Sequence, residues 1–368
     1  MSDARSAYAA SGVDYDALDH AKREAVAAAR ATSALALARG ARIDDASRGE
    51  SALVLEIGSE TLSFVVEGLG TKSLIGTAVE AEGGDGRYDA IAYDAVAAIV
   101  NDLICVGALP VVVNAYFATG DAAWYGRGDR LGQLVRGWER ACRDAGAVWG
   151  GGESPSLPGL VSPDHLELAG SAIGRIPDGA RPILGDRLAA GDEIVLVDSS
   201  GLHANGATLA RTVAARLPQG YATRLDSGAS YGAALLEPTL LYAGLVEALV
   251  SQQVPVSYLS HVTGHGFRKL MRADKPLTYA IETLPQVPEV LAFLVQQLGL
   301  DAREAYGTFN MGAGLAVYSA AGSGEQVVAA ARELGLRAHV AGQVEAGPRQ
   351  VLLRQLGVTY ADDELSLR

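Results

Sequence analysis

The chain has 368 residues, a length that predicts two domains because a single hydrophobic core seldom grows so large. Hydrophobic residues make up 49% and charged residues 20%, which is typical of a folded globular protein and excludes an intrinsically disordered one. The net charge of −13 argues against nucleic acid as a partner, since a phosphate backbone is bound by a cationic surface.

The sequence contains no run of the roughly 18 apolar residues that would span a membrane. Its first residues also lack the basic and apolar blocks of a signal peptide. The two cysteines, Cys105 and Cys142, indicate no disulfide framework. We therefore expect a cytoplasmic protein that does not bind membranes.

The first half of the chain alternates predicted helices and strands. An Ala-rich segment without Gly or Pro predicts a helix over residues 15–38, and two apolar runs at 52–56 and 62–67 predict a hairpin about Gly58. Apolar residues at helical spacing predict a long buried helix over 89–106. The remaining predictions here are a strand at 110–116, a helix at 131–145, a closing glycine turn at 150–152 and a strand at 165–176.

A Pro- and Gly-containing segment at 177–182 is the predicted linker between domains 1–176 and 177–368. After it, the pattern predicts strands at 193–197 and 314–318 and near Val340 and Val351, and helices at 204–217, 229–252, 288–298 and 324–334. Strand and helix alternate in both halves, which predicts an α/β fold with α+β layers.

The most informative motif follows an apolar run that ends at Glu67. Gly68 and Gly70 allow the backbone to approach a ligand closely, and Thr71 and Lys72 add a hydroxyl and an ammonium. This is not a Walker loop, which requires a different spacing of glycines before Lys and Ser or Thr. A tight turn followed by a surface lysine remains the alternative.

Three acids are candidates for one magnesium site. Glu67 precedes the glycine turn, Asp102 lies in an apolar helical pattern, and Glu153 follows three glycines. Magnesium prefers oxygen ligands and commonly keeps water and phosphate oxygens in its shell. For Glu153, a plain loop carboxylate is the alternative.

Two histidines lie between polar and glycine-rich residues. His203 falls within 199–206, between a predicted strand and a predicted helix, where free backbone amides can bind anions. His261 follows an apolar strand and precedes a glycine turn, and histidine exchanges protons near neutral pH. A surface role for His203 and a helix cap at Asn205 are the alternatives.

Taken in order, these motifs resemble the aminoimidazole ribonucleotide synthetase family, also called phosphoribosylformylglycinamidine cyclo-ligase. The matching segments are 12–16, 68–72, 100–103, 116–120, 151–153, 158–159, 199–206, 238–239, 261–266 and 308–314. The resemblance implies an N-terminal α/β domain contributing to a dimer-spanning barrel and a C-terminal α/β domain with a mixed sheet. It further implies a homodimer that uses ATP and Mg²⁺ to close an imidazole ring on a small phosphorylated substrate.

The resemblance also implies roles for individual residues. His203, His261 and Lys72 would be catalytic, and Glu67, Asp102 and Glu153 would hold the metal. The residues expected to bind ATP are Gly68, Gly70, Thr71, Lys72, Asn101, Gly151, Gly152 and Lys22.

Several positions depart from the family pattern. Glu67 stands where an aspartate is usual, and a glycine-rich segment expected near 39–45 is missing. Leu240 replaces an arginine, and His265 replaces a glycine and is followed by Arg268, Lys269 and Arg272. Two alternatives therefore stay open: a paralogue that phosphorylates another small amide or carboxylate, and a catalytically inactive nucleotide-binding subunit.

Overall fold

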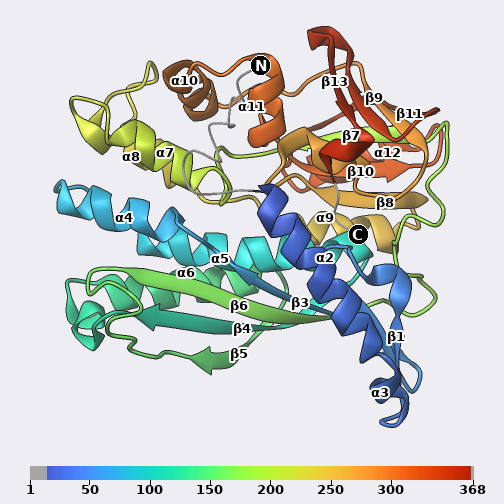
Figure 1. Cartoon of the computed structure of the whole chain (residues 1–368), viewed down its shortest axis with the longest axis horizontal. Coiled ribbons are helices and arrows are strands. Elements are labelled where there is room, and N and C mark those ends of the chain that lie inside the picture. The colour runs from blue at the N-terminus through green and yellow to red at the C-terminus, as the bar shows by residue number, and fades with distance from the viewer. Residues whose placement is uncertain (1–14, 366–368) are drawn as a thin grey trace.

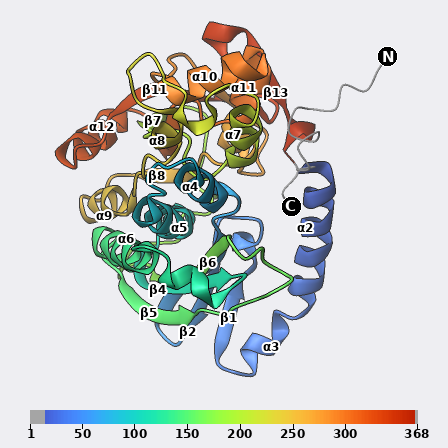
Figure 2. The ribbon, with the colours of Figure 1, turned by 90° about the vertical axis from the view of Figure 1, so that its left-hand side faces the viewer.

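The computed structural model describes the backbone of residues 15–365, with side chains described at residue 21 and from residue 24 onward. Two β-sheets, one from each half of the chain, lie on either side of a layer of helices (Figure 1). A view turned by 90° places α4 and α5 in the same middle layer (Figure 2). This arrangement confirms the α/β fold with layered sheets and helices.

The N-terminal sheet has the strand order β1-β2-β3-β6-β4-β5 in the described residues, and all neighbours are antiparallel except β4 and β5. Its strands are β1 (Ala41–Asp44), β2 (Leu53–Ile57), β3 (Glu60–Gly68), β4 (Leu109–Thr119), β5 (Val148–Glu153) and β6 (Leu166–Arg175). Side chains alternate along β4: Val113, Ala115 and Phe117 are buried against the helices, as the period of two for a half-buried strand requires.

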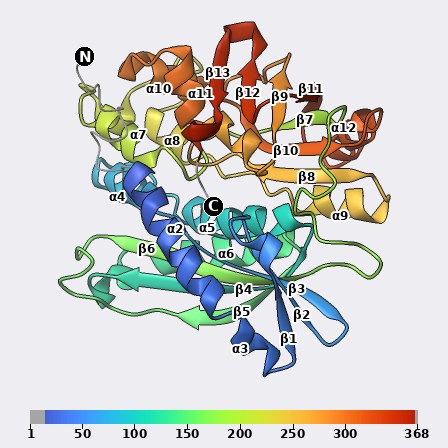
Figure 3. The same ribbon diagram turned by 45° about the vertical axis from the view of Figure 1, so that its right-hand side comes forward.

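The middle layer consists of α4 (Lys72–Ala81), α5 (Tyr88–Leu103) and α6 (Arg130–Asp144). Helices α2 (Tyr15–Ala31) and α3 (Ala34–Leu37) lie to one side in Figure 2, and α2 crosses in front of the N-terminal sheet in Figure 3. α5 is buried along most of its length because it packs on β3 and β6 and also faces the C-terminal half. Close packing needs small residues: a Cβ added at Gly170 of β6 would lie 2.7 Å from Ile99 of α5. Burying a side chain such as Ile99 contributes about 1.5–3 kcal/mol.

The C-terminal sheet has the order β13-β12-β9-β11-β7-β10-β8 in the described part of the chain and is mixed, because β12 and β9 pair in parallel. Its strands are β7 (Glu193–Asp198), β8 (Val256–His261), β9 (Leu277–Ile281), β10 (Ala313–Ser319), β11 (Ala338–Ala346), β12 (Gln350–Leu353) and β13 (Val358–Ala361). The helices of this half are α7 (Ala207–Ala214), α8 (Tyr231–Leu235), α9 (Ala243–Ser251), α10 (Glu289–Leu298), α11 (Ala302–Thr308) and α12 (Gly324–Glu333).

Three sequence predictions were wrong in detail, and one helix was missed. The helix expected over 15–38 is interrupted between α2 and α3, and the helix expected over 229–252 is divided into α8 and α9 by residues 236–242. Pro238 lies in that break and lacks the N–H group that a helix interior uses. The glycines at 150–152 form part of strand β5, and α4 was not predicted.

None of the described helices combines the length and the apolar character needed to cross a membrane.

Candidate functional site

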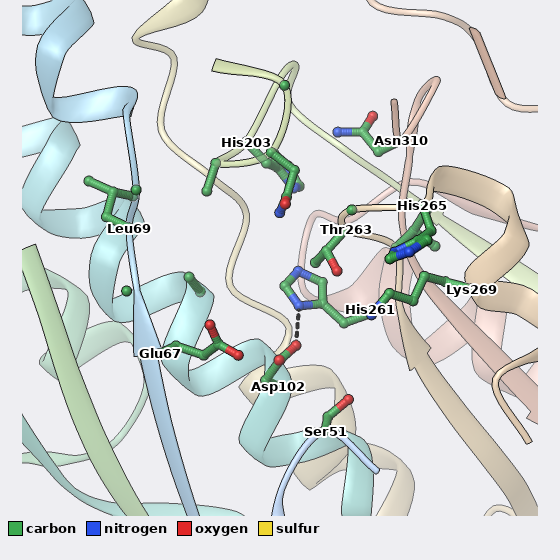
Figure 4. Close-up of a pocket in the computed structure, with 18 of the residues that line it drawn as sticks. Ser51, Glu67, Leu69, Asp102, His203, His261, Thr263, His265, Lys269 and Asn310 are labelled. Atoms are coloured by element: carbon green, nitrogen blue, oxygen red, sulfur yellow. Dashed lines mark hydrogen bonds and ion pairs between the residues drawn. The ribbon is translucent and has the colours of Figure 1, made fainter. Parts of the chain in front are cut away.

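A cavity of about 610 Å³ lies where the C-terminal half meets α5 and the end of β3. Figure 4 shows its side chains converging from both halves of the chain, with Glu67 and Asp102 on one side and His265 and Lys269 on the other. Of the predicted residues, the cavity is lined by Glu67, Gly68, Gly70, Thr71, Asp102, His203 and His261. Residues more than 190 positions apart therefore form one site.

Helix α5 carries a polar stripe on the side that contacts the C-terminal half. Asp94, Asn101 and Asp102 are separated by seven and eight residues, about two helical turns, so their side chains share one face. Asp102 is hydrogen-bonded to His261 at the end of β8, with Asp102 Oδ1 2.7 Å from His261 Nδ1. This contact joins the two halves of the chain at the centre of the cavity (Figure 4).

Glu67 lies beside Asp102 because it occupies the row of β3 that faces α5, paired with Gly170. Burial, together with the negative charge of Asp102 and a hydrogen bond to it, raises the pKa of Glu67 to about 8. Burial acts to raise the pKa of Asp102 as well, but the hydrogen bond and charge of His261 outweigh it and lower that pKa below its usual value. Near neutral pH, Glu67 is thus largely a neutral acid next to an ionised Asp102.

His203 is held in a strained, buried loop at the other side of the cavity. Its φ is +60°, its side chain is 5% exposed, and Nε2 accepts a hydrogen bond from the Ser200 N–H at 3.2 Å. Burial and the nearby charges of His261 and Lys72 lower the pKa of His203 well below its usual value, so the ring is neutral. Because Nε2 accepts, Nδ1 carries the proton, and it has no hydrogen-bond partner among the described residues.

The polar, glycine-rich segment at 308–314 holds the loop of residues 199–203 through Asn310. The Asn310 Nδ2 donates to the carbonyl oxygens of Gly201 and Leu202 at 2.8 and 3.2 Å, and its Oδ1 accepts from the Ser199 hydroxyl at 2.8 Å. Gly314 has no room for a side chain, since a Cβ would lie 1.8 Å from the Tyr242 hydroxyl and 2.9 Å from His203 Cε1. This segment fixes the loop that carries His203.

The glycine turn after β3 meets two helix N-termini. Gly70 has a φ of +73°, and α4 begins two residues later, while α7 begins directly after Gly206, whose φ is +96°. The hydroxyls of Thr71 and Thr208 lie 2.9 Å apart, which places the starts of the two helices side by side. Unpaired N–H groups and the positive ends of helix dipoles favour anions there.

The cationic residues that follow His265 lie at the opposite part of the cavity wall. Lys269 and Arg272 line the cavity, and their charges act to lower the pKa of both Glu67 and Asp102. Arg272 donates to the Gly49 carbonyl at 3.0 Å, and its Nε lies 3.7 Å from a carboxylate oxygen of Glu50. Arg268 instead donates to the carbonyls of His265 and Gly307 and does not line the cavity.

The structure places Lys72, predicted to be catalytic and to bind ATP, in a buried ion pair away from the cavity lining. Its ammonium lies 2.5 Å from Asp94 Oδ2, both side chains are fully buried, and Lys72 does not line the cavity. Helix α4 begins at this residue and turns its side chain inward, where the carboxylate of Asp94 compensates the buried charge. Asp94 itself was not among the predicted residues, although its helical spacing to Asp102 was a usable signal.

Asn101, predicted to bind ATP, also lies outside the cavity lining. Asn101 is fully buried, donates to the Leu240 carbonyl at 2.8 Å and accepts from the Tyr242 N–H at 3.1 Å. Asp94 accepts from the Thr239 N–H at 2.6 Å in the same way. These contacts satisfy the N–H groups of Thr239 and Tyr242 and the carbonyl of Leu240 in the break between α8 and α9, and they fasten the break to α5.

Glu153, Gly151 and Gly152 lie on the edge strand β5, outside the cavity. The register aligns Glu153 with Tyr116, Ala169 and Gly68, three strand spacings or roughly 14 Å away from β3. Since side chains alternate, Glu153 also faces the side of the sheet opposite to Glu67. Within one chain the predicted three-carboxylate metal site is therefore not formed, and no group of three His, Cys, Asp or Glu residues suited to a metal occurs among the described residues.

The side chain of Lys22, predicted to bind ATP, lies outside the described residues.

Comparison with known proteins agrees with this architecture. A family model described as AIR synthase related protein, N-terminal domain, matches residues 49–176, and the model of the C-terminal domain matches residues 189–354. The chain belongs to the AIR synthase family. The family resemblance drawn from the sequence is thus confirmed.

Two curated members of the AIR synthase family match most of the chain. The phosphoribosylformylglycinamidine cyclo-ligase of Methanothermobacter thermautotrophicus is 33% identical over 307 residues, which cover 80% of this chain and 83% of the relative. The protein of the same name from Anaeromyxobacter sp. (strain K) is 38% identical over 285 residues, covering 76% of this chain and 79% of the relative.

Solved structures show the same fold at lower identity. The HypE-HypF complex has a TM-score of 0.58 and 17% identity, covering 85% of this chain and 93% of that chain. Hydrogenase maturation protein HypE in complex with ATP has a TM-score of 0.56 and 22% identity, covering 81% of this chain and 83% of that chain.

Proposed function

We propose that this chain is an ATP-dependent cyclo-ligase that converts formylglycinamidine ribonucleotide to aminoimidazole ribonucleotide, ADP and phosphate in purine biosynthesis. The curated relatives, matched over about 80% of their length, are named phosphoribosylformylglycinamidine cyclo-ligase. The observation that carries the proposal is a single cavity that holds the glycine turn, two adjacent carboxylates and two histidines. The ATP-bound structure of HypE, a protein of the same fold, supports the use of ATP.

The chemistry requires activation of an amide oxygen, which is a poor leaving group. Transfer of the γ-phosphoryl group of ATP to this oxygen gives an imidate phosphate and ADP. A nitrogen of the same substrate then attacks the activated carbon, the C–O bond breaks, and inorganic phosphate leaves with the bonding electron pair. Holding both ends of the substrate in one cavity favours this intramolecular attack.

The phosphates of ATP fit the part of the cavity formed by Gly68, Gly70 and Thr71. The N-termini of α4 and α7 meet there through the Thr71–Thr208 contact, so backbone N–H groups can bind phosphate oxygens in a protein of net charge −13. Lys72 takes no direct part in the proposed binding, because its ammonium forms a buried ion pair with Asp94.

Glu67 and Asp102 fit a magnesium ion. The negative charge of Asp102 raises the proton affinity of Glu67, and a divalent cation between the two carboxylates would offset their repulsion. Magnesium is commonly held by one or two carboxylates together with phosphate oxygens. The ion would neutralise negative charge on the transferred phosphoryl group. Glu67 would lose its proton on binding, which makes metal affinity increase with pH.

The pair His261–Asp102 is placed to move a proton. Asp102 fixes the orientation of the imidazole through Nδ1, so Nε2 is the atom available to the substrate nitrogen that loses its proton on ring closure. Neutral His203 offers its Nδ1–H as a donor to a developing negative charge.

We also propose a homodimer formed through the outer face of the N-terminal sheet. The register places Phe64, Ile173, Val112 and Val148 in one row across β3, β6, β4 and β5. Three of these four side chains are exposed in the single chain, as is neighbouring Val66 at 62%. An apolar band of this kind is typical of a subunit interface.

The test is incubation of the purified protein with ATP, Mg²⁺ and formylglycinamidine ribonucleotide, with detection of the ring product and ADP. Equal amounts of both products are expected, and Asp102→Asn should lower kcat by about 100-fold or more. Substrate-dependent ADP release from another amide or carboxylate, without this ring product, would favour a paralogue. No ATP binding at all would favour an inactive subunit.

A further inference from the structure

His265 occupies a backbone conformation that residues with a β-carbon seldom adopt. Its φ is +70° in the turn between β8 and the following 3-10 helix, and its side chain is 3% exposed. A residue with a β-carbon in this left-handed region stores backbone strain, and such strain persists where the site requires the side chain.

The surrounding structure forces this conformation on the turn. A Cβ at the next residue, Gly266, would lie 2.1 Å from the Tyr306 carbonyl oxygen, so the turn is pressed against the end of α11. The Gly266 N–H donates to the Thr263 carbonyl at 3.0 Å, and the Arg268 side chain donates to the His265 carbonyl at 3.2 Å. The backbone is thus fixed on both sides of His265.

The His265 side chain joins Thr263 and Lys269 in lining the cavity. Figure 4 shows His265 and Lys269 across the cavity from Leu69, with His261 and Asp102 between. The end near Leu69 is the one with the helix N-termini assigned above to ATP. An imidazole, a hydroxyl and an ammonium at the other end are a set of groups that bind a phosphate monoester.

Given the proposed function, on which this step rests, we infer that His265 and Lys269 form the subsite for the phosphate of the ribonucleotide substrate. His265 is a specificity-determining residue: it distinguishes a phosphorylated substrate from its dephosphorylated form. The strain in the turn is retained because the backbone must present this side chain.

The experiment measures binding of ribose 5-phosphate, ribose and ATP, each by calorimetry, to the wild-type protein and to His265→Gly. We expect a loss of about tenfold or more in affinity for ribose 5-phosphate, with affinity for ATP unchanged within about twofold. Gln253→Gly is the matched control, because Gln253 also has a positive φ, +55°, and is exposed outside the cavity. It should bind all three ligands as the wild type does.

His265→Asn is the second variant, to be used if His265→Gly folds poorly. It keeps an N–H donor and tolerates the left-handed conformation, so it should retain part of the affinity for ribose 5-phosphate. Lys269→Met should weaken ribose 5-phosphate binding as His265→Gly does. Unchanged ribose 5-phosphate affinity in His265→Gly, no binding of it by the wild type, or a loss of ATP affinity instead would each overturn the inference. His265-dependent binding without any ring-closing activity would uphold the subsite and refute the proposed function.

Discussion

The buried pair Lys72–Asp94 gives a prediction that separates a structural lysine from a phosphate-binding one. Lys72→Met keeps the length of the side chain and leaves Asp94 charged, fully buried and without its partner. Breaking a buried ion pair from one side costs about 3–5 kcal/mol, because the remaining charge is uncompensated. We therefore expect the free energy of unfolding in urea to fall by about that amount.

A second substitution should restore most of this stability. Asp94→Asn removes the orphaned charge and keeps Oδ1, which accepts the Thr239 N–H at 2.6 Å. The double variant should therefore recover roughly 2 kcal/mol or more relative to Lys72→Met alone, since both charges are now absent. Asp94→Asn alone should be destabilised, because it leaves the lysine unpaired.

Activity decides between the two roles. If Lys72 only positions α4 and the glycine turn, the double variant should keep kcat within about tenfold of the wild type at a temperature where it is folded. If Lys72→Met kept its stability within about 1 kcal/mol but lost more than 100-fold in kcat, and the second substitution restored nothing, the reasoning from burial would be refuted.

Three further predictions concern other parts of the molecule. In EDTA, the unfolding free energy of the wild type should fall as pH rises from about 5 to 8, because folded Glu67, with a pKa raised to about 8, holds a proton that the unfolded chain releases. Glu67→Gln should lack this decline, and parallel pH profiles for the two proteins would contradict it. Asn101→Ala should lower the free energy of unfolding by about 2–5 kcal/mol, because two buried backbone groups lose their hydrogen-bond partners. Its ATP affinity should stay the same, and weaker ATP binding by the folded variant would support a cofactor-binding role. Val66→Glu should convert a dimer to a monomer in sedimentation while its circular dichroism spectrum stays that of the folded chain, and a wild type that sediments as a monomer would rule out the proposed interface.

The sequence predicted the elements whose periodicity is strong. The hairpin about Gly58 and the buried helix α5 were expected from local patterns that tertiary packing reinforces. Division of the predicted helix at 229–252 was missed, because Pro238 was outweighed by the apolar run around it. Only the fold shows that Asp94 and Asn101 provide hydrogen-bond partners for the backbone in that break.

For the site, local chemistry identified residues but not their directions. Glu67, Asp102, His203 and His261 were correctly expected to converge, since polar residues flanked by apolar runs and glycines mark strand and helix ends. Glu153 lies apart from the other two carboxylates of the same chain because its place depends on strand order: β6 and β4 intervene between β5 and β3, and no local pattern encodes that.

The hydrogen bonds that join α5 to residues 236–242 involve only main-chain atoms of that segment. Asp94 and Asn101 bind the N–H groups of Thr239 and Tyr242 and the carbonyl of Leu240, whatever side chains those residues carry. A side-chain substitution at position 240 should therefore leave these contacts in place, whereas a substitution of Asp94 or Asn101 would remove them.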